Sequence, residues 1–566
     1  MVELRSLSEV CDAERPADGA VALRGGRVFR RAEFLARVWA WRDLLVRRNG
    51  RHWALYSSDS YDFACALFGA WYAGKTVFLP ADAGAGTLDR LRPQVDGFIG
   101  EFALAEALTA PEAISSGPSG ASLESEAVVL VVFTSGTTGA PVAIPKTVRQ
   151  LDREVRVLHS LWGVEVDRVP VLASVPHHHM YGLPFKVLWP LCRGATFSSD
   201  SVSYPEDVAA RLTRAPGVWV ASPALLKRLP EDLPLAAARP NVRMVFSAGS
   251  PLPFEAAQRC AALLGRPVVE IYGSSETGVV GWRVQADPDT PWRPFPGVSV
   301  AQSVDGDVLA VRSPWLATEA EWLTADRGKV YPDGSFCLLG RVDRIVKVEE
   351  KRVSLAALEQ ALTTSSLVRE ARVLALPDGR LAAAAVLHPE GWEMLRRAGK
   401  PAVVERLRAW LRSHGEGAAI PRRWRFMDAL PQDPMGKIAD AMLRELLTRP
   451  DPSRREPQVL RTTQHEHAIE LQFFIPPDLL CFEGHFPQAP ILPGVIQVEW
   501  AVAFARRFFE LPKDFRRLEM LKFQRVVGPG MTLVLALEYV AASQAVTFRY
   551  VSDAGQHSSG RIAFGE

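Results

Sequence analysis

Short apolar runs alternate with amphipathic helical stretches over residues 1–340, and this pattern constrains the fold more than any other feature of the sequence. The apolar runs lie at Val128–Phe133, Val171–Val175, Val218–Ala221, Met244–Ser247 and Val268–Ile271. Continuous apolar runs of this length are typical of strands that helices cover on both faces. The pattern therefore predicts a large α/β domain with mainly parallel strands, which we place at residues 1–341.

Two smaller units are expected after this α/β domain. Residues 342–447 read as a small α+β domain, with helices at 356–363 and 403–413 and strands at 371–376 and 381–387. A charged, Pro-rich stretch at 449–457 predicts a linker, which we place at 448–463. The third unit, residues 464–566, has one strand, a helix over 494–509 and strand-like runs at 518–527, 531–541 and 545–552. One helix against an antiparallel sheet is the simplest interpretation, so the whole chain is predicted to be a multidomain α/β protein.

Composition narrows the class of partners. The chain has 566 residues, with 66 Lys and Arg against 64 Asp and Glu, and a formal net charge of +2 gives no global field that favours nucleic acid or an anionic membrane. The six cysteines are scattered, which argues against a disulfide framework or a structural zinc. We see neither a secretory leader nor an apolar stretch that would span a membrane, so we expect a cytoplasmic protein.

A segment rich in glycine and hydroxyl groups follows the first of the apolar runs. It is Thr134-Ser135-Gly136-Thr137-Thr138-Gly139. Backbone N–H groups freed by glycine, together with hydroxyls, can bind a polyphosphate. The segment is not a Walker loop, because no Gly-Lys-Ser/Thr sequence follows. Such a segment alone is more often a surface turn, so its interpretation depends on motifs further along the chain.

Four later motifs supply the groups that polyphosphate chemistry needs. They are Ile271-Tyr-Gly-Ser-Ser-Glu276-Thr-Gly278, Trp322-Leu-Thr-Ala-Asp326, Gly340-Arg341-Val-Asp343 and Pro434-Met-Gly-Lys437. In this order, with the glycine-hydroxyl segment, they resemble the signatures of the adenylate-forming superfamily of acyl-CoA synthetases, luciferases and peptide-synthetase adenylation domains. The resemblance covers residues 20–446, and the ordered set of motifs is highly specific.

The resemblance implies a role for each matching residue of the large domain. The segment from Thr134 to Gly139 would hold the phosphates of ATP, and Glu276 would bind the Mg²⁺ that neutralises phosphate charge. Tyr272 and Gly273 would flank the adenine and the acyl group, with Ser275 in place of the usual threonine. Asp326 would accept hydrogen bonds from the ribose hydroxyls, and Arg341 would lie near the ribose and the phosphate.

The same resemblance assigns two residues to the motion and chemistry of the small domain. Asp343 falls at the hinge about which that domain turns between half-reactions. Lys437 would bridge the acyl carboxylate and the phosphate, as a fixed positive charge on the transition state. Only eleven of the 66 basic residues are lysines, which favours a functional Lys437 over a solvated surface lysine.

The segment Pro176-His-His-His-Met-Tyr-Gly182 is interpreted as part of the acyl pocket rather than as a metal cluster. Three adjacent histidines in an extended or turn segment cannot all face one point. His179 aligns with the family's aromatic or histidine gate, whereas His177 and His178 are expected to be ordinary neighbours. The other residues expected to line the pocket are Tyr181, Phe246, Ser247 and Gly249.

Two positions depart from the family pattern. Val142 replaces the lysine that commonly follows Pro141, and Lys146 occurs a few residues later. Glu350 stands where a glycine usually lies beside the pantetheine tunnel. Because a bulky anion there bears on the thioester-forming step, the resemblance supports adenylation more strongly than thiolation.

A separate motif marks the third unit. It is Gly484-His485-Phe-Pro-Gln-Ala-Pro-Ile-Leu-Pro493-Gly494-Val, with Glu499 fourteen residues after the histidine. A Pro-Gly pair suits a helix start, where the N–H of Gly494 could polarise a carbonyl oxygen. His485 could remove the proton next to a thioester carbonyl, and Glu499 could protonate the departing hydroxyl.

This motif resembles the hot-dog 3-hydroxyacyl-ACP dehydratases over residues 464–566. In that family the histidine base and the glutamate acid meet across a dimer interface, so the resemblance implies a homodimer formed through the hot-dog domain. Trp500 follows Glu499 where small residues are usual, and we expect it to narrow the acyl tunnel.

A ligase fused to a dehydratase resembles the paired enzymes of aryl-polyene, xanthomonadin-type pigment pathways. The resemblance predicts ATP-dependent activation of a hydroxybenzoate- or cinnamate-like acid, loading onto the phosphopantetheine thiol of an acyl carrier protein, and dehydration of 3-hydroxyacyl thioesters. One alternative is a fatty acyl-CoA or acyl-ACP ligase with a dehydratase. The other, motivated by Val142 and Glu350, is a non-catalytic scaffold that docks carrier proteins.

Overall fold

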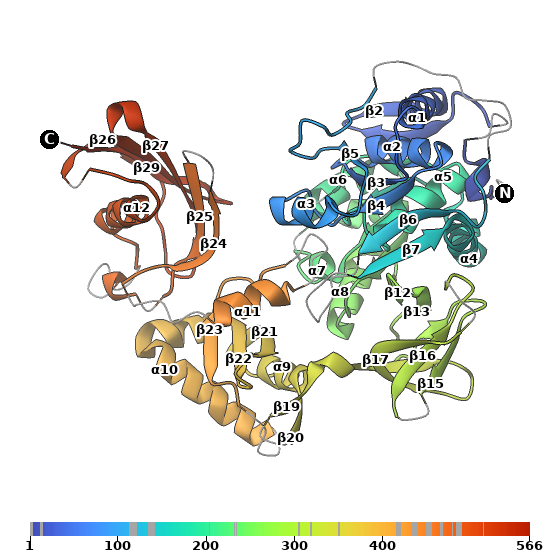
Figure 1. Cartoon of the computed structure of the whole chain (residues 1–566). Coiled ribbons are helices and arrows are strands. Elements are labelled where there is room, and N and C mark those ends of the chain that lie inside the picture. Colours follow the sequence, from blue (N-terminus) through green and yellow to red (C-terminus); the bar gives the residue numbers. More distant parts are fainter. Residues whose placement is uncertain are drawn as a thin grey trace. The chain divides into compact units, whose positions relative to one another are not determined.

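The described residues fold into two compact units, one that ends at Asp343 and one that begins at Arg344. The computed structural model describes residues 4–565 except 12–14, 112–121, 134–141, 203, 231–232, 234, 304–305, 317–319, 349–350, 415–419, 433–437, 449–454, 465–467, 478, 483–489 and 513. Figure 1 shows the helices and strands of both units. Among the helices of the described residues, none combines the length and apolar character needed to cross a bilayer.

The first unit contains three sheets. The nine-stranded sheet has the order β14 (Arg293–Pro294), β13 (Gly278–Arg283), β12 (Val268–Ser274), β11 (Val242–Ala248), β10 (Gly217–Ala221), β8 (Val171–Ala173), β9 (Phe197–Ser198), β1 (Ala20–Arg24) and β2 (Arg27–Arg30). The five-stranded sheet has the order β5 (Gly97–Gly100), β3 (His52–Tyr56), β4 (Thr76–Leu79), β6 (Val128–Phe133) and β7 (Ala143–Thr147). The four-stranded sheet has the order β15 (Ser299–Gln302), β16 (Val308–Arg312), β17 (Trp322–Val330) and β18 (Phe336–Arg341).

Helices accompany the two larger sheets, whose central pairs β8–β10, β10–β11, β11–β12, β3–β4 and β4–β6 are parallel. These helices are α1 (Arg31–Val46), α2 (Ser60–Tyr72), α3 (Ala85–Leu91), α4 (Val148–Val166), α5 (Trp189–Arg193), α6 (Pro205–Arg214), α7 (Pro223–Leu226) and α8 (Phe254–Leu264). The predicted α/β body with mainly parallel strands is therefore confirmed (Figure 1).

The start of α4 illustrates how the sequence sets these elements. Thr147 caps the helix, because its hydroxyl accepts a hydrogen bond from the N–H of Gln150 at 3.3 Å. The Gln150 side chain accepts in return from the N–H of Thr147 at 2.8 Å, which completes a capping box. This helix therefore begins directly after β7, and its buried face carries Glu154 into the interior.

The second unit contains a small α+β region and a hot-dog-like region. The small region has a hairpin of β19 (Ile345–Val348) and β20 (Lys351–Ser354), a sheet of β21 (Val368–Ala375), β22 (Leu381–Leu387) and β23 (Arg423–Phe426), and helices α9 (Leu355–Thr363), α10 (Pro389–His414) and α11 (Asp440–Thr448). The C-terminal sheet has the order β24 (Gln458–Gln464), β25 (Ala468–Phe474), β27 (Thr532–Val540), β28 (Ala545–Ser552), β29 (Gly555–Phe564) and β26 (Phe515–Phe523). All its strand pairs are antiparallel.

One helix, α12 (Gly494–Phe508), packs its apolar face on this six-stranded sheet (Figure 1). Trp500, Ala501, Phe504 and Ala505 share a core with side chains from the strands. The expected helix against an antiparallel sheet is therefore confirmed. All six cysteines are free, as their spacing predicted.

One predicted boundary needs correction, one predicted helix is confirmed, and one strand was missed. The predicted linker 448–463 is too long, because β24 already pairs with β25 from Gln458 onward. The predicted helix at 403–413 is confirmed as the part of α10 that follows a kink at Gly399, where φ is 75°. Strand β29 was not predicted, because it begins with the polar sequence Gly555-Gln-His-Ser-Ser, which is not typical of a buried strand.

Candidate functional site

Three of the predicted ATP-binding residues, which lie on strands β12, β17 and β18, meet in the first unit. Antiparallel pairing of β17 with β18 places Asp326 opposite Arg341, and the two side chains lie 3.7 Å apart as an ion pair. The Tyr272 hydroxyl, at the end of β12, donates a 2.7 Å hydrogen bond to the other carboxylate oxygen of Asp326. The sequence motifs are thus brought together from segments 54 residues apart.

The ring of Tyr272 is wedged between two other aromatic side chains. Its centroid lies 5.7 Å from that of Trp292 and 5.7 Å from that of Phe336. Burial, together with the charge of Asp326, raises the pKa of Tyr272 well above its usual value. The phenol therefore keeps its proton, orients the carboxylate of Asp326, and leaves that carboxylate's remaining lone pairs for another donor.

The predicted metal-binding residue, Glu276, lies in a tightly bonded turn between β12 and β13. Within this turn the Thr277 hydroxyl accepts a 3.1 Å hydrogen bond from the N–H of Ser274, and the Ser274 hydroxyl accepts one of 3.1 Å from the N–H of Thr277. Gly278 has φ of 64°, and a Cβ there would lie 2.5 Å from the Trp315 ring, so glycine is required. We call Ser274–Gly278 the acid turn.

The acid turn also receives a contact that the sequence did not predict. The ammonium group of Lys146, on β7, donates a 3.0 Å hydrogen bond to the backbone carbonyl oxygen of Glu276. Lys146 was noticed only as a displaced lysine of the family motif. Its spacing along the sequence gives no sign of this contact, because the contact joins residues 130 positions apart.

The half-buried carboxylate of Glu276 fits the requirement for a magnesium site with nucleotide phosphates. Mg²⁺ usually takes one or two carboxylates and completes its shell with phosphate oxygens and water. Within the described part of the chain, no group of three or more His, Cys, Asp or Glu side chains forms an all-protein metal cage. A single acid on a fixed turn therefore suits an ion that arrives with ATP.

The residues predicted to line the acyl pocket lie in two environments. His179 is half-buried, and its Nδ1 accepts a 3.5 Å hydrogen bond from the N–H of Tyr181. Gly249 is exposed at the end of β11, whereas Ser247 is buried with a hydroxyl that meets no hydrogen-bond partner among the described residues. A buried hydroxyl of this kind is available to a ligand that reaches it.

Phe246 differs from the other predicted pocket residues, because none of its surface is exposed. Its ring packs edge-on against Trp162 at 4.9 Å and Phe185 at 5.0 Å between centroids. A bound acid would touch Phe246 only if these rings moved, so its contact with substrate stays a prediction. The sequence identified the strand correctly but gave no indication of this aromatic cluster.

The neighbouring histidines behave as expected from the sequence. His177 is buried, with Nδ1 2.8 Å from the Ser60 hydroxyl and Nε2 3.0 Å from the carbonyl oxygen of Ser57. Burial lowers the pKa of His177 well below its usual value and that of His178 to about 4. Both rings are therefore neutral at pH 7, and His177 has a structural role.

The described part of the dehydratase motif lies on α12. Pro493 is the N-cap and Gly494 is the first helical residue, so the proline lies one position before the place where it is favoured. A Cβ at Gly494 would lie 2.5 Å from the Phe523 ring, so a larger residue there would displace that half-exposed ring. Glu499 lies on the same helix and is exposed.

A buried polar network fixes the start of α12. The Ser558 hydroxyl donates a 2.6 Å hydrogen bond to the side chain of Gln497, whose backbone oxygen accepts one of 2.7 Å from the Tyr550 hydroxyl. Trp500 packs in the same core, and its indole N–H donates to the Arg455 carbonyl oxygen at 3.1 Å. The structure therefore shows that Trp500 packs in the core, and its expected role in narrowing an acyl tunnel stays a prediction.

Several predicted residues lie outside the described residues. They are Thr134, Ser135, Gly136, Thr137, Thr138, Gly139, Glu350, Lys437 and His485. Asp343 is the last residue of the first unit and lies in the short 3₁₀ helix Val342–Arg344. Gly273 is exposed and Ser275 is half-buried, and both lie in the segment that precedes Glu276.

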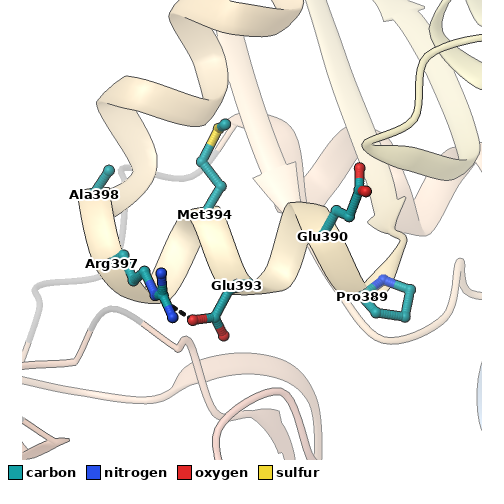
Figure 2. A pocket seen from close by; sticks show the side chains of 6 residues that line it. All are labelled: Pro389, Glu390, Glu393, Met394, Arg397 and Ala398. Carbon is teal, nitrogen blue, oxygen red and sulfur yellow. Dashed lines mark ion pairs between the residues drawn. The ribbon is translucent and has the colours of Figure 1, made fainter.

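A surface hollow lies along α10 (Figure 2). Its lining comes from a single helix and consists of Pro389, Glu390, Glu393, Met394, Arg397 and Ala398. Glu393 and Arg397 form an ion pair one helical turn apart. An exposed i,i+4 pair of this kind mainly supports the helix, and the hollow contains none of the predicted site residues.

The α/β body, the carboxylate-tyrosine-arginine cluster and the acid turn define an adenylate-forming class of protein. Comparison with known families agrees: residues 81–312 match a model described as AMP-binding enzyme, and residues 357–437 match the AMP-binding enzyme C-terminal domain. The chain belongs to the AMP-binding enzyme family, and its residues 461–561 match the model described as ApeI dehydratase. The protein is therefore an AMP-forming ligase that carries a dehydratase-type domain.

Individual relatives support the same assignment. A 4-coumarate–CoA ligase of Cereibacter sphaeroides is 31% identical, over 54% of this chain and 69% of that protein. A malonate–CoA ligase of Arabidopsis thaliana is 26% identical, over 56% of this chain but only 60% of that protein. The solved structure of O-succinylbenzoate coenzyme A synthetase from Bacillus subtilis, in complex with AMP, has a TM-score of 0.64, 18% identity, and covers 79% of this chain and 99% of its own.

Proposed function

We propose that this protein activates an aromatic carboxylic acid with ATP and loads the acyl group onto the phosphopantetheine thiol of an acyl carrier protein. The observation that carries the proposal is the Tyr272–Asp326–Arg341 cluster in a chain of the AMP-binding family. A hydroxybenzoate- or cinnamate-like acid is supported by the 4-coumarate–CoA ligase relative.

In this proposal a carboxylate oxygen of the acid attacks the α-phosphate of ATP and displaces pyrophosphate. The thiol then attacks the acyl carbon and displaces AMP. Asp326 binds the ribose hydroxyls, and the neutral Tyr272 holds its carboxylate in place. Glu276 binds Mg²⁺, which neutralises phosphate charge when present.

The residues outside the described ranges keep the roles that the family resemblance gives them. Thr134–Gly139 hold the phosphates, and Lys437 provides the fixed charge on the transition state. We also propose the domain limits 1–341 and 342–447, with Asp343 as the hinge. A cytoplasmic location agrees with this use of ATP.

The C-terminal domain is proposed to dehydrate 3-hydroxyacyl thioesters, as in aryl-polyene pigment synthesis. The Gly494 N–H would polarise the thioester carbonyl, His485 would remove the adjacent proton, and Glu499 would protonate the departing hydroxyl. The exposure of Glu499 fits a site that is completed by a second copy of the chain.

A homodimer through the hot-dog domain is supported by the edge strand β26. Large apolar side chains are exposed along this strand: Phe515 at 48%, Leu518 at 38%, Met520 at 70%, Leu521 at 38% and Phe523 at 50%. An edge strand with so much exposed apolar surface favours pairing with another strand.

The decisive experiment is ATP–pyrophosphate exchange with a panel of aryl, alkyl and malonate-like acids. We expect the highest kcat/KM with a hydroxybenzoate or cinnamate, followed by transfer to a holo carrier protein more readily than to CoA. A higher kcat/KM with a long alkyl acid would contradict the aryl substrate and favour the fatty acyl ligase alternative. If no acid supports exchange, and neither Lys437→Ala nor His485→Ala alters pathway flux, the scaffold alternative is correct.

A further inference from the structure

Two buried charged side chains form hydrogen bonds to the backbone of the residues that flank Thr277 and Gly278. Lys146 on β7 donates to the carbonyl oxygen of Glu276 at 3.0 Å. Glu154 on α4 accepts a 3.0 Å hydrogen bond from the N–H of Val279, at the far side of the acid turn. The acid turn is therefore tied to β7 and α4, which directly follow the glycine-hydroxyl segment in sequence.

These two side chains are among the most buried charges of the unit. Lys146 is 3% exposed and Glu154 is 2% exposed. Burial raises the pKa of Glu154 to about 7, an effect that the charge of Lys146 opposes; burial lowers the pKa of Lys146, and Glu154 opposes that shift. Burying a charged side chain costs free energy. Because Lys146 and Glu154 both direct hydrogen bonds to the backbone of the acid turn or the residue that follows it, their burial suggests a role beyond general stability.

The contacts also differ from those needed merely to form the turn. The Ser274 and Thr277 side chains already close it from within, and the Trp315 indole N–H holds the Val279 carbonyl oxygen at 3.0 Å. Lys146 and Glu154 add two contacts that fix the position of the acid turn relative to β7 and α4. A small displacement of a ligand group is enough to impair binding or catalysis.

We propose that Lys146 and Glu154 are positioning residues that hold the backbone of the acid turn, so that Glu276 presents its carboxylate to Mg²⁺. This inference rests on the proposed role of Glu276 in adenylation. Lys146 acts through the Glu276 carbonyl oxygen and touches neither substrate nor metal.

The test compares Lys146→Met, which keeps the stem but removes the donor, with Lys75→Met as a matched control. Lys75 is also buried, and its ammonium group donates to the carbonyl oxygens of Arg48 and Gly50 at 2.7 and 2.6 Å. The measured quantity is the Mg²⁺ concentration that gives half-maximal ATP–pyrophosphate exchange in the full-length protein. We expect Lys146→Met to raise it by about tenfold, from the loss of one charged hydrogen bond, and Lys75→Met to leave it within about twofold.

Glu154 provides a second pair of variants. Glu154→Gln keeps an oxygen that accepts from the Val279 N–H, whereas Glu154→Met does not. We expect Glu154→Met to raise the Mg²⁺ requirement more than Glu154→Gln does. In a Glu276→Gln background, Lys146→Met should add no further change, because both act on one group.

Two results would overturn the proposal: a Mg²⁺ requirement for Lys146→Met that matches that of Lys75→Met, or additive effects of Lys146→Met and Glu276→Gln. The affinity for ATP at several Mg²⁺ concentrations, measured by calorimetry, needs no acid substrate. If the unaltered protein exchanges with no acid, the proposed function fails, and calorimetry with the same variants still decides the positioning role. An ATP affinity that is independent of Mg²⁺ in the unaltered protein would reject it.

Discussion

Replacing Asp326 with asparagine separates a role in nucleotide binding from a role in stability. Asparagine keeps the shape of the side chain and an oxygen that the Tyr272 hydroxyl can still use, but it removes the negative charge. The ion pair with Arg341 is 3.7 Å long, and the two side chains are 21% and 43% exposed. Exposed pairs of this kind contribute about 1 kcal/mol or less, so the fold should lose little.

The effect on ATP binding should be larger than the effect on stability. A hydrogen bond from a ribose hydroxyl to a carboxylate contributes about 1.5–3 kcal/mol, which corresponds to a roughly 10- to 100-fold weaker affinity for ATP when the charge is lost. Calorimetric titration with ATP, beside urea-induced unfolding, measures both quantities on the same sample.

A matched control lies in the same sheet. Asp307 pairs with Arg327, the residue that follows Asp326 on β17. Both carboxylate oxygens of Asp307 lie 2.9 Å from Nε of the Arg327 guanidinium. Asp307→Asn removes a similar charge from a similar partner but should leave ATP affinity unchanged. Equal ATP affinities for Asp326→Asn and the unaltered protein would refute the ribose assignment, as would an Asp307→Asn variant that is equally impaired.

Three other outcomes are expected. Met520→Glu should shift the full-length protein from dimer to monomer in light scattering, and an unaltered protein that is already a 62.2 kDa monomer would contradict the dimer. Gly494→Ala should impair dehydration while exchange stays normal, because its Cβ would collide with the Phe523 ring and shift the Gly494 N–H; an unimpaired variant would show that this close contact does not position the N–H. Burial lowers the pKa of His178 to about 4, so its stabilising effect is present above pH 6.5 and is lost as the pH falls toward 4. The free energy of unfolding of the unaltered protein should therefore fall between pH 7 and pH 5, and His178→Phe should make that fall smaller by about 2 kcal/mol. If the fall is the same in both proteins, His178 is not its origin.

The sequence was most informative where a residue acts through its place in a linear motif. The run Val128–Phe133 and the helix at Gly494 were placed correctly, because apolar periodicity and helix-start residues are local signals. Asp326 and Tyr272 were selected through a family resemblance, and their hydrogen bond came only from the structure. The pairing of Asp326 with Arg341 likewise depends on the β17–β18 register, which includes an irregularity at Arg327–Gly328.

Polar residues inside the core misled the sequence interpretation of the C-terminal domain. Strand β29 buries His557 and Ser558, whose hydrogen bonds to the Ser552 side chain and the Gln497 side chain satisfy them. Burying a polar group is tolerable only with such partners, and the partners come from β28 and α12. A pattern of residue types along one strand cannot reveal them.

The same reasoning explains why Lys146 was first treated as a misplaced family lysine. Along the sequence it stands beside Pro145 and Thr147, in a segment that resembles an exposed strand end. Its buried contact with Glu276 requires β7 to turn that position inward and the acid turn to lie against it. In the proposed arrangement the buried Lys146 holds the backbone of the acid turn. The Mg²⁺ dependence of Lys146→Met measures how much of the exchange activity depends on that support.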